Sequence, residues 1–531
     1  MTRFIGFLVV AVLSLALASR ASAEGTLRIG MTAADIPYTG GQPDNGFEGF
    51  RFVGYQVYEP LINWDLSRSD KLPALVPGLA ESWEVSKADP KKWIFKLRKN
   101  VKFHDGSAFN ADAVVFTFDS VKNKQSPQHD TYGSAQLSWR LSALKAMRKV
   151  DDHTIEIETP IVSSFVPYQV VYMLIVSPAQ WNKVKDWRKF AEQPSGTGPF
   201  KMTRFVPRER LELEANKAYW DPKRMPKVDK VVLLPMPEPT TRLAALRSGQ
   251  VDWIEVPPPD SIAQLKGAGF SIVTNKYPHN WGHILRLDKE PWNNKLVRKA
   301  ANYAIDRVGI CKNLLNDTCV PGTGVAYKGH PWFGNPKEVY EYNPAKAKEL
   351  LKQAGFDGTK RPAKAVQLIS TSGSGQMLPL AMNELVQKNL KDVGIDIDLQ
   401  PIEWNSLTQR FRAGFTGDNA GVNAMNISFN FVEPFSAFGR FFHSKSVPPA
   451  SVNIMPFVNP ESDKLLDEAE KTFDLAKQDA IFAKLHELVI DEAPWIFVVH
   501  DLNPRAMTAK VKGFVPPQSW FVDLTTVSVT K

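Results

Sequence analysis

Residue patterns that could perform catalysis or bind a metal are few in this 531-residue chain. The run Ser372-Gly373-Ser374-Gly375 differs in spacing from the G-x-S-x-G turn that presents a nucleophilic serine. His279 and His283 are four positions apart, but their stretch lacks the glutamate of H-E-x-x-H and reads as a strand. In a strand such positions lie roughly 13 Å apart, too far for one zinc ion. We therefore expect neither an enzyme nor a protein that holds a metal or another cofactor.

The first residues predict export. Arg3 precedes an apolar run, residues 5–18, that is too short to span a bilayer, and Ala21-Ser22-Ala23 is an A-x-A cleavage pattern. Residues 1–23 are predicted to be a cleaved signal peptide, with a retained N-terminal anchor as the alternative. No cysteine lies near the cleavage point, so no lipid anchor is expected.

The only two cysteines, Cys311 and Cys319, lie eight positions apart. A redox pair is typically C-x-x-C, so catalysis is not expected of them. In an exported chain a local disulfide is the favoured interpretation. Two buried thiols are the alternative, because Cys311 lies on a predicted helix with an apolar face.

Composition and charge indicate a soluble protein of more than one lobe. The hydrophobic content is 43% and the charged content 23%, as in globular proteins. A chain of this length is longer than a single hydrophobic core usually accommodates, so two or more lobes are expected. Removal of Arg3 and Arg20 with the signal lowers the net charge from +9 to +7, and the remaining basic residues are spread along the chain, so nucleic acid binding is not expected. A predicted strand at 231–234, helix at 240–248 and strand at 251–256 favour α/β architecture.

Several ordered blocks carry a family resemblance. Between residues 80 and 117 the chain reads A-E-S-W-E-V, then W-I-F-K-L-R-K-N-V-K-F-H-D-G, then F-N-A-D-A-V-V-F-T. Further blocks are G-T-G-P-F at 196–200, N-x-x-Y-W at 216–220 and R-K-A-A-N-Y-A-I-D-R at 298–307. This order resembles the peptide-type (family 5) extracellular solute-binding proteins of ABC importers.

The resemblance implies a two-lobed α/β fold of the periplasmic-binding-protein type, class II and cluster C-like, with an extra subdomain in the first lobe. Lobe I is then residues 24–277, with the subdomain inserted at about 55–190. Lobe II is residues 278–500, and residues 501–531 return to lobe I. The resemblance also implies a periplasmic monomer that hands a small solute to the membrane subunits of an ABC permease and their ATPase.

The same resemblance points to a ligand site. Peptide-binding relatives present the run W-x-x-D-x-x-[DE]-P, whose aspartate neutralises the α-ammonium of the ligand. The corresponding run here is residues 427–434, with Asn430 in place of the aspartate. An amide there removes a charge-assisted bond, and Glu433 replaces it only if its side chain points inward. Trp404 matches a pocket tryptophan of relatives, and Arg410 lies about one residue from an arginine that pairs with ligand carboxylates. The candidate ligand-binding residues are Asn280, Trp281, Trp404, Arg410, Ser428, Phe429, Asn430, Phe431 and Glu433.

We expect a substrate-binding protein that captures a peptide or peptide-like solute in a cleft between its lobes. With Arg410 present and the aspartate absent, a ligand that carries carboxylate or other acceptor groups and no free amine is preferred. Asn280, Asn430 and Trp281 would equally suit a sugar-like or opine-like ligand. The alternative within the class is a non-peptide solute: an opine, an oligosaccharide or a chelated metal. A sensory receptor would share the cleft. A secreted hydrolase is the alternative of another class, and it requires a nucleophile and base that we do not find in the sequence.

Overall fold

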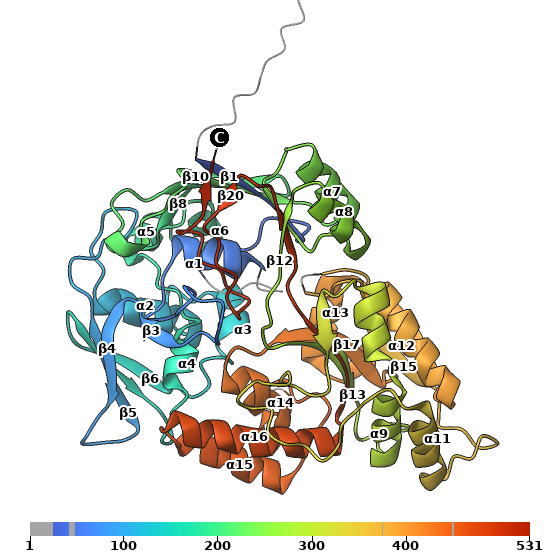
Figure 1. Ribbon diagram of the computed structural model, residues 1–531. Coiled ribbons are helices and arrows are strands. Elements are labelled where there is room, and N and C mark those ends of the chain that lie inside the picture. Colours follow the sequence, from blue (N-terminus) through green and yellow to red (C-terminus); the bar gives the residue numbers. More distant parts are fainter. Residues whose placement is uncertain (1–24, 42–47, 374, 449–450, 531) are drawn as a thin grey trace, which may run out of the picture.

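The computed structural model describes residues 25–41, 48–373, 375–448 and 451–530. The predicted signal peptide, residues 1–23, lies outside the described residues. The chain forms a mixed α/β structure of two lobes, each built on its own sheet (Figure 1). Among the described residues, no helix has the length and apolar composition needed to cross a membrane.

The first lobe is built on a seven-stranded sheet. The central strand β1 (Thr26–Met31) runs parallel to both of its neighbours. The predicted strand-helix-strand unit is present as β10, α7 (Pro239–Arg247) and β11. In sheet order the strands are β12 (Ser271–Val273), β19 (Arg505–Met507), β11 (Trp253–Glu255), β1, β10 (Lys230–Pro235), β9 (Arg210–Ala215) and β8 (Phe200–Val206).

A smaller unit is inserted between β1 and β8. Its antiparallel sheet has the order β4 (Ala80–Val85), β5 (Lys92–Leu97), β7 (Thr154–Glu158) and β6 (Ala146–Asp151). Its helices are α2 (Ala111–Lys122), α3 (Thr131–Leu137), α4 (Val166–Val170), α5 (Pro178–Val184) and α6 (Trp187–Glu192). Asn110 begins α2 by accepting a hydrogen bond from the amide of Ala113. In Figure 1 this unit lies on the left, with α3 and α4 toward the second lobe.

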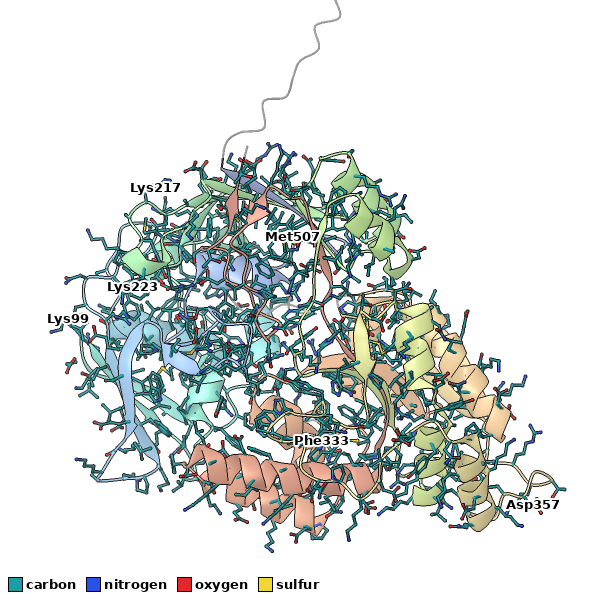
Figure 2. All side chains as sticks on the ribbon, in the orientation of Figure 1. Lys99, Lys217, Lys223, Phe333, Asp357 and Met507 are labelled. Atoms are coloured by element: carbon teal, nitrogen blue, oxygen red, sulfur yellow. A yellow bond between two sulfur atoms is a disulfide. The ribbon has the colours of Figure 1, made fainter. Side chains whose placement is uncertain are left out.

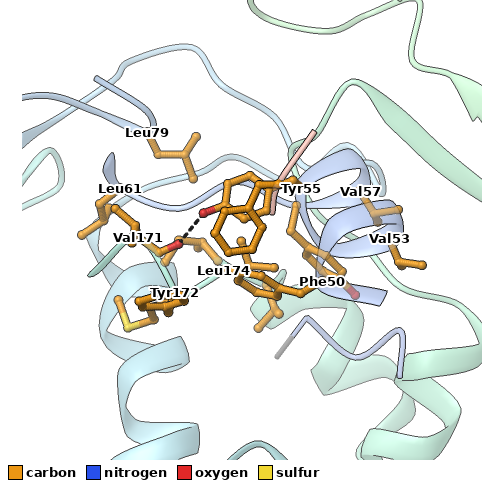
Figure 3. Close-up of a cluster of buried hydrophobic side chains, with 14 of the residues drawn as sticks. Phe50, Val53, Tyr55, Val57, Leu61, Leu79, Val171, Tyr172 and Leu174 are labelled. Carbon is orange, nitrogen blue, oxygen red and sulfur yellow. Dashed lines mark hydrogen bonds between the residues drawn. The ribbon is translucent and has the colours of Figure 1, made fainter. Parts of the chain in front are cut away.

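Aromatic side chains near residues 50–55 pack against the segment at residues 171–172 in the first lobe. Phe50 and Tyr55 pack edge to face with ring centroids 5.1 Å apart, and Phe50 stacks on Tyr172 at 6.2 Å. The Tyr55 hydroxyl donates to the carbonyl of Val171 at 3.1 Å (Figure 3). These buried side chains belong to the same core cluster as Leu27 and Ile29 of β1.

The second lobe is built on a six-stranded sheet flanked by helices. Its strand order is β14 (Cys319–Pro321), β18 (Trp495–Asp501), β13 (His279–Leu285), β17 (Ala424–Asn430), β15 (Ala365–Ser370) and β16 (Ile397–Ile402). Its main helices are α9 (Lys295–Ala304), α11 (Pro344–Gln353), α12 (Pro379–Val393), α13 (Trp404–Ala413), α15 (Pro460–Lys471) and α16 (Leu475–Glu492). A disulfide joins Cys311 to Cys319 beside β14.

The chain crosses between the two sheets twice. One crossing leads from β12 to β13, and the other leads from β18 back to β19. The amide of Asn275 donates to the carbonyl of Leu502 at 3.0 Å, so the two crossing segments lie side by side. The exact residue ranges given for the lobes stay a prediction.

Glu59 links two of the recognised sequence blocks. It is buried, and its carboxylate accepts hydrogen bonds from Thr197 (2.9 Å), Tyr219 (2.6 Å) and Trp220 (2.6 Å). Burial raises the pKa of Glu59, while the charge of Arg224 and these donors act in the opposite direction. The G-T-G-P-F and N-x-x-Y-W blocks therefore have a structural role here, away from the second lobe.

A second contact between the lobes is made by the end of α15, the start of α16 and the turn between them. Gln478 donates to the hydroxyl of Ser164 at 2.8 Å, and the amide of Ser164 donates to the carbonyl of Glu470. Phe473 lies 5.8 Å from the ring of Trp93 on β5. In Figure 1 the two helices extend along the bottom of the molecule to the inserted unit. Charged side chains such as Lys99, Lys217 and Asp357 point outward at the periphery (Figure 2).

Candidate functional site

Five of the predicted site residues lie on two neighbouring strands, β13 and β17. Their antiparallel register pairs Asn280 with Phe429, Trp281 with Ser428, and His279 with Asn430. These residues come together because residues 424–430 form the strand that follows α13 and returns beside the crossing tract.

Asn280 and Trp281 belong to the interior of the second lobe. Both are fully buried. The side-chain amide of Asn280 donates to the carbonyl of Gly324 at 3.0 Å, and Trp281 packs in the same cluster as Trp292 and Val297. Every residue of β13 is buried, so both faces of this strand are covered. Neither side chain therefore has exposed surface for a solute.

Arg410 and Trp404 both lie on α13 but are engaged locally. Arg410 donates from Nε to Asn419 Oδ1 at 2.6 Å and from Nη2 to the carbonyl of Asp418 at 2.8 Å. Its guanidinium thus holds the turn that follows α13. Trp404 is half-buried against the loop after β15, where a side chain at Gly373 would lie 2.7 Å from the indole ring.

Ser428, Phe429 and Asn430 end β17 and become progressively more accessible. Ser428 is buried and accepts a hydrogen bond from Gln376 Nε2 at 2.5 Å. Asn430 is half-buried, and its enclosed Oδ1 has no hydrogen-bond partner among the described residues. An enclosed carbonyl oxygen without a partner costs free energy, and a solute N–H group can satisfy it.

Phe429 and Phe431 form an aromatic layer at the end of β17. The ring of Phe429 lies 4.9 Å from that of Phe441 and 6.0 Å from that of Trp495. Phe431 is buried and stacks on Phe429 at 6.0 Å, whereas Phe429 is half-buried. Phe429 is thus the member of this layer with surface left for a solute.

Both oxygens of the Glu433 carboxylate accept hydrogen bonds from backbone amides. It accepts hydrogen bonds from the amides of Phe435 at 2.7 Å and Ser436 at 2.8 Å, and so begins the helical turn at Phe435–Gly439. The side chain is 2% exposed, and burial raises the pKa of Glu433. Because both oxygens already have partners, this carboxylate does not take the place of the missing aspartate.

The structure adds charged residues that the sequence patterns did not single out. Arg440 is 6% exposed, and its Cζ lies 4.4 Å from the ring of Phe441, 5.0 Å from Phe429 and 5.2 Å from Trp139. Arg140 lies on the same indole, with its Cζ 3.9 Å from the Trp139 ring. Trp139 and Arg140 come from the inserted unit, so the two lobes meet at this tryptophan.

A third arginine joins the lobes close by. Arg412, two positions after Arg410 on α13, donates to Gln136 Oε1 of α3 at 2.7 Å. Arg140 donates to the backbone carbonyl of the same Gln136 at 2.5 Å. Positions i and i+2 of a helix point to nearly opposite sides, which explains why Arg412 reaches the other lobe and Arg410 does not.

Burial lowers the pKa values of both arginines at this junction, and a neighbouring positive charge adds to the effect at Arg140. Burial lowers the pKa of Arg440 to about 10, and the charge of Glu433 opposes that change. Burial, followed by the positive charge of Arg440, lowers the pKa of Arg140. Arg440 therefore remains a cation at neutral pH. The only sequence signal for this site was Arg440, the one charged residue in the largely apolar run at residues 435–442.

Comparison with known proteins gives a consistent picture. Residues 74–448 match the model of bacterial extracellular solute-binding proteins, family 5. The chain is 28% identical to heme-binding protein A of Haemophilus influenzae, over 87% of this chain and 84% of that protein. It is 27% identical to the dipeptide-binding protein of Escherichia coli, over 92% and 94%.

Solved structures share the fold. The periplasmic binding protein DppA from Helicobacter pylori, in complex with the peptide STSA, superposes with a TM-score of 0.81 at 23% identity and covers 96% of this chain and 98% of its own. AgaA from A. tumefaciens R10, in complex with agropinic acid, has a TM-score of 0.79 at 21% identity, over 96% and 99%. Both confirm the expected two-lobed fold with an additional unit in the first lobe.

Proposed function

The chain belongs to the bacterial extracellular solute-binding proteins of family 5, and from this premise we propose that it is the periplasmic substrate-binding component of an ABC importer. It captures a peptide or peptide-like solute between its lobes and delivers the solute to the membrane permease and its ATPase. The dipeptide-binding relative from Escherichia coli, similar along nearly its whole length, supports the choice of solute.

The observation that carries this proposal is the way the lobes are joined. Two adjacent crossing segments connect the sheets, and side chains of the inserted unit meet side chains of the second lobe at Trp139, Gln136 and Ser164. Such a connection permits the lobes to close on a solute as rigid bodies. The solute favours the closed form by contacting both lobes, and a permease then distinguishes loaded from empty protein.

The remaining expectations belong to the same proposal. The protein is exported by a cleaved signal peptide without a lipid anchor, acts as a monomer and catalyses no reaction. The family match supports this view, because its members are described as extracellular solute-binding proteins. Its partners are the solute, the permease and the ATPase, and no nucleic acid.

The test is identification of the solute that the protein holds. Protein purified from its periplasm is denatured, and the released small molecules are identified by mass spectrometry. A peptide or peptide-like compound is expected, and adding it back at 100 times its Kd should stabilise the protein by about 2.7 kcal/mol. Chemical conversion of the compound by the purified protein, or the absence of any stabilising solute, would contradict the proposal.

A second candidate is the same role for a non-peptide solute. Asn430 favours it, because this neutral side chain stands where peptide-binding relatives carry an aspartate. Relatives named for heme and agropinic acid support a range of solutes within this fold. The same mass spectrometry separates the two candidates by the identity of the released compound.

A further inference from the structure

Resting on the proposed function, we propose that the solute is an acid whose anionic group is bound by Arg440, with Arg140 adding positive charge from the other lobe, and that the solute needs no free amine. The substrate class is then carboxylate-bearing peptides and peptide-like acids, including those with a blocked amino terminus. The site comprises Arg440, Arg140 and Trp139, with Phe429 and Asn430 beside it.

Arg440 is a buried cation with donors to spare. Its Nε donates to the carbonyl of Ser436 at 2.8 Å. Within the described part of the chain, neither terminal nitrogen makes a hydrogen bond, and no carboxylate oxygen lies within 4.0 Å of the guanidinium. A buried charge is costly unless it is paired. Three aromatic rings near the guanidinium stabilise the cation, but they do not neutralise its charge as an anion would.

Glu433 does not take this role. Its oxygens accept the amides of Phe435 and Ser436, and it makes no ion pair with Arg440 within 4.0 Å. Its charge acts on Arg440 only through space. A solute carboxylate is thus the group that would complete the hydrogen bonding of Arg440.

Arg140 adds a second positive charge from the other lobe. It lies on the Trp139 ring that Arg440 also contacts, and the two cations repel each other. An anion bound by Arg440 near this ring is attracted by both positive charges. Because Arg140 belongs to the inserted unit and Arg440 to the second lobe, the anion binds best when the lobes are together. The same contact therefore selects the solute and favours closure.

The neighbouring polar group points to the same class of solute. Asn430 carries no charge, so it offers no partner that would specifically hold an ammonium group. Its enclosed Oδ1 accepts an amide N–H equally well from a peptide with a free or a blocked terminus. Two cations nearby disfavour an ammonium group at this position.

The experiment compares chemically modified pools of one casein digest. One portion is N-acetylated, which removes the terminal amines, and another is methyl-esterified, which removes the carboxylates. Binding to the solute-free protein is measured by thermal shift and by mass spectrometry of retained peptides. We expect the acetylated pool to bind as the untreated pool does, and the esterified pool to lose at least about 10-fold in affinity. Equal binding of the esterified pool, or loss of binding on acetylation alone, overturns the inference.

Substitutions of Arg440 test its role in binding the solute. Arg440→Gln should weaken binding of the untreated pool about 10- to 100-fold, and Arg440→Lys, which keeps the charge, should lose less. Arg188→Gln, an exposed arginine on α6, is the matched control and should bind as wild type does. If Arg440→Gln fails to fold, the comparison of peptide pools on the wild-type protein still tests whether binding requires the carboxylate and not the amine. Binding of no pool at all contradicts the proposed peptide function itself, and the inference falls with it.

Discussion

Tyr277 and Asp501 join the two segments that connect the lobes. The Tyr277 hydroxyl donates to Asp501 Oδ2 at 2.9 Å, and both side chains are buried. His279, Arg51 and Arg505 also face this pair. The second oxygen of Asp501 accepts the amide of Asn503 at 2.8 Å. The crossing point is thus held by a buried, hydrogen-bonded carboxylate rather than by apolar packing alone.

This carboxylate should make stability depend on pH. Burial raises the pKa of Asp501 from 3.8 to about 6, so the folded chain binds this proton more tightly than the unfolded chain does. The contribution of Asp501 to stability therefore decreases as the pH rises from about 4 to about 6, by about 3 kcal/mol, and is constant above that range. Chemical denaturation of wild type and Asp501→Asn at pH 4 and pH 7 measures this difference.

The comparison with Asp501→Asn isolates the one group. Buried histidines nearby, His279 and His500, each have a pKa lowered to about 3 and give the opposite trend in both proteins. Asp260→Asn, at an exposed position, is the control and should follow the wild-type profile. Parallel profiles for wild type and Asp501→Asn would show that Asp501 does not titrate in this range.

Glu59→Gln should destabilise the first lobe without changing solute specificity. Glutamine brings an NH₂ group into a site where three donors converge, so at least one buried hydrogen bond is lost. The expected cost is about 2 to 3 kcal/mol of unfolding free energy. Thermal and urea denaturation measure it, with the exposed Glu81→Gln on β4 as the control. A stability equal to wild type would mean that Glu59 is not an essential acceptor.

Asn430→Asp should improve affinity for peptides with a free amino terminus. A carboxylate at this enclosed position forms a charge-assisted hydrogen bond with the ligand ammonium, and we expect about a 10-fold gain. Isothermal titration with a dipeptide before and after N-acetylation measures the gain and its dependence on the amine. Asn405→Asp, exposed on α13, is the control. No gain for the free dipeptide would show that Asn430 does not face the solute amine.

Removing the disulfide should lower stability by about 2 to 3 kcal/mol. The bond between Cys311 and Cys319 closes a short loop and restricts the unfolded chain. Cys311→Ala/Cys319→Ala is compared with wild type by urea denaturation, each with and without reductant. Only wild type should respond to the reductant. An unchanged urea denaturation midpoint in the double variant would mean that the disulfide does not restrict the unfolded chain enough to affect stability.

The architecture could be predicted because its signals are local. The strand, helix and strand predicted at 231–234, 240–248 and 251–256 are present as β10, α7 and β11. Asn430 and Phe429 were identified from a motif in one continuous stretch, and the structure leaves both half-buried at the end of β17. Local patterns of this kind can be recognised in a single sequence without knowledge of the tertiary contacts.

The site could not be fully predicted because its contacts join distant residues. Trp281 lies on a strand covered on both faces, so alternation does not reveal which face meets the other lobe. Arg440 and Trp139 are about 300 positions apart, and no local pattern links them. Arg410 differs from Arg412 by half a helical turn, which an approximate alignment does not resolve.

The contact of the α15–α16 turn with Ser164 and Trp93 has a kinetic consequence. It lies at the edge of the molecule, and none of its residues is among those assigned to the solute. Lobe separation has to break it whether or not a solute is bound, so it contributes to the activation barrier for opening. Loosening this turn should therefore shorten the residence time of a bound solute while leaving the solute's own contacts intact.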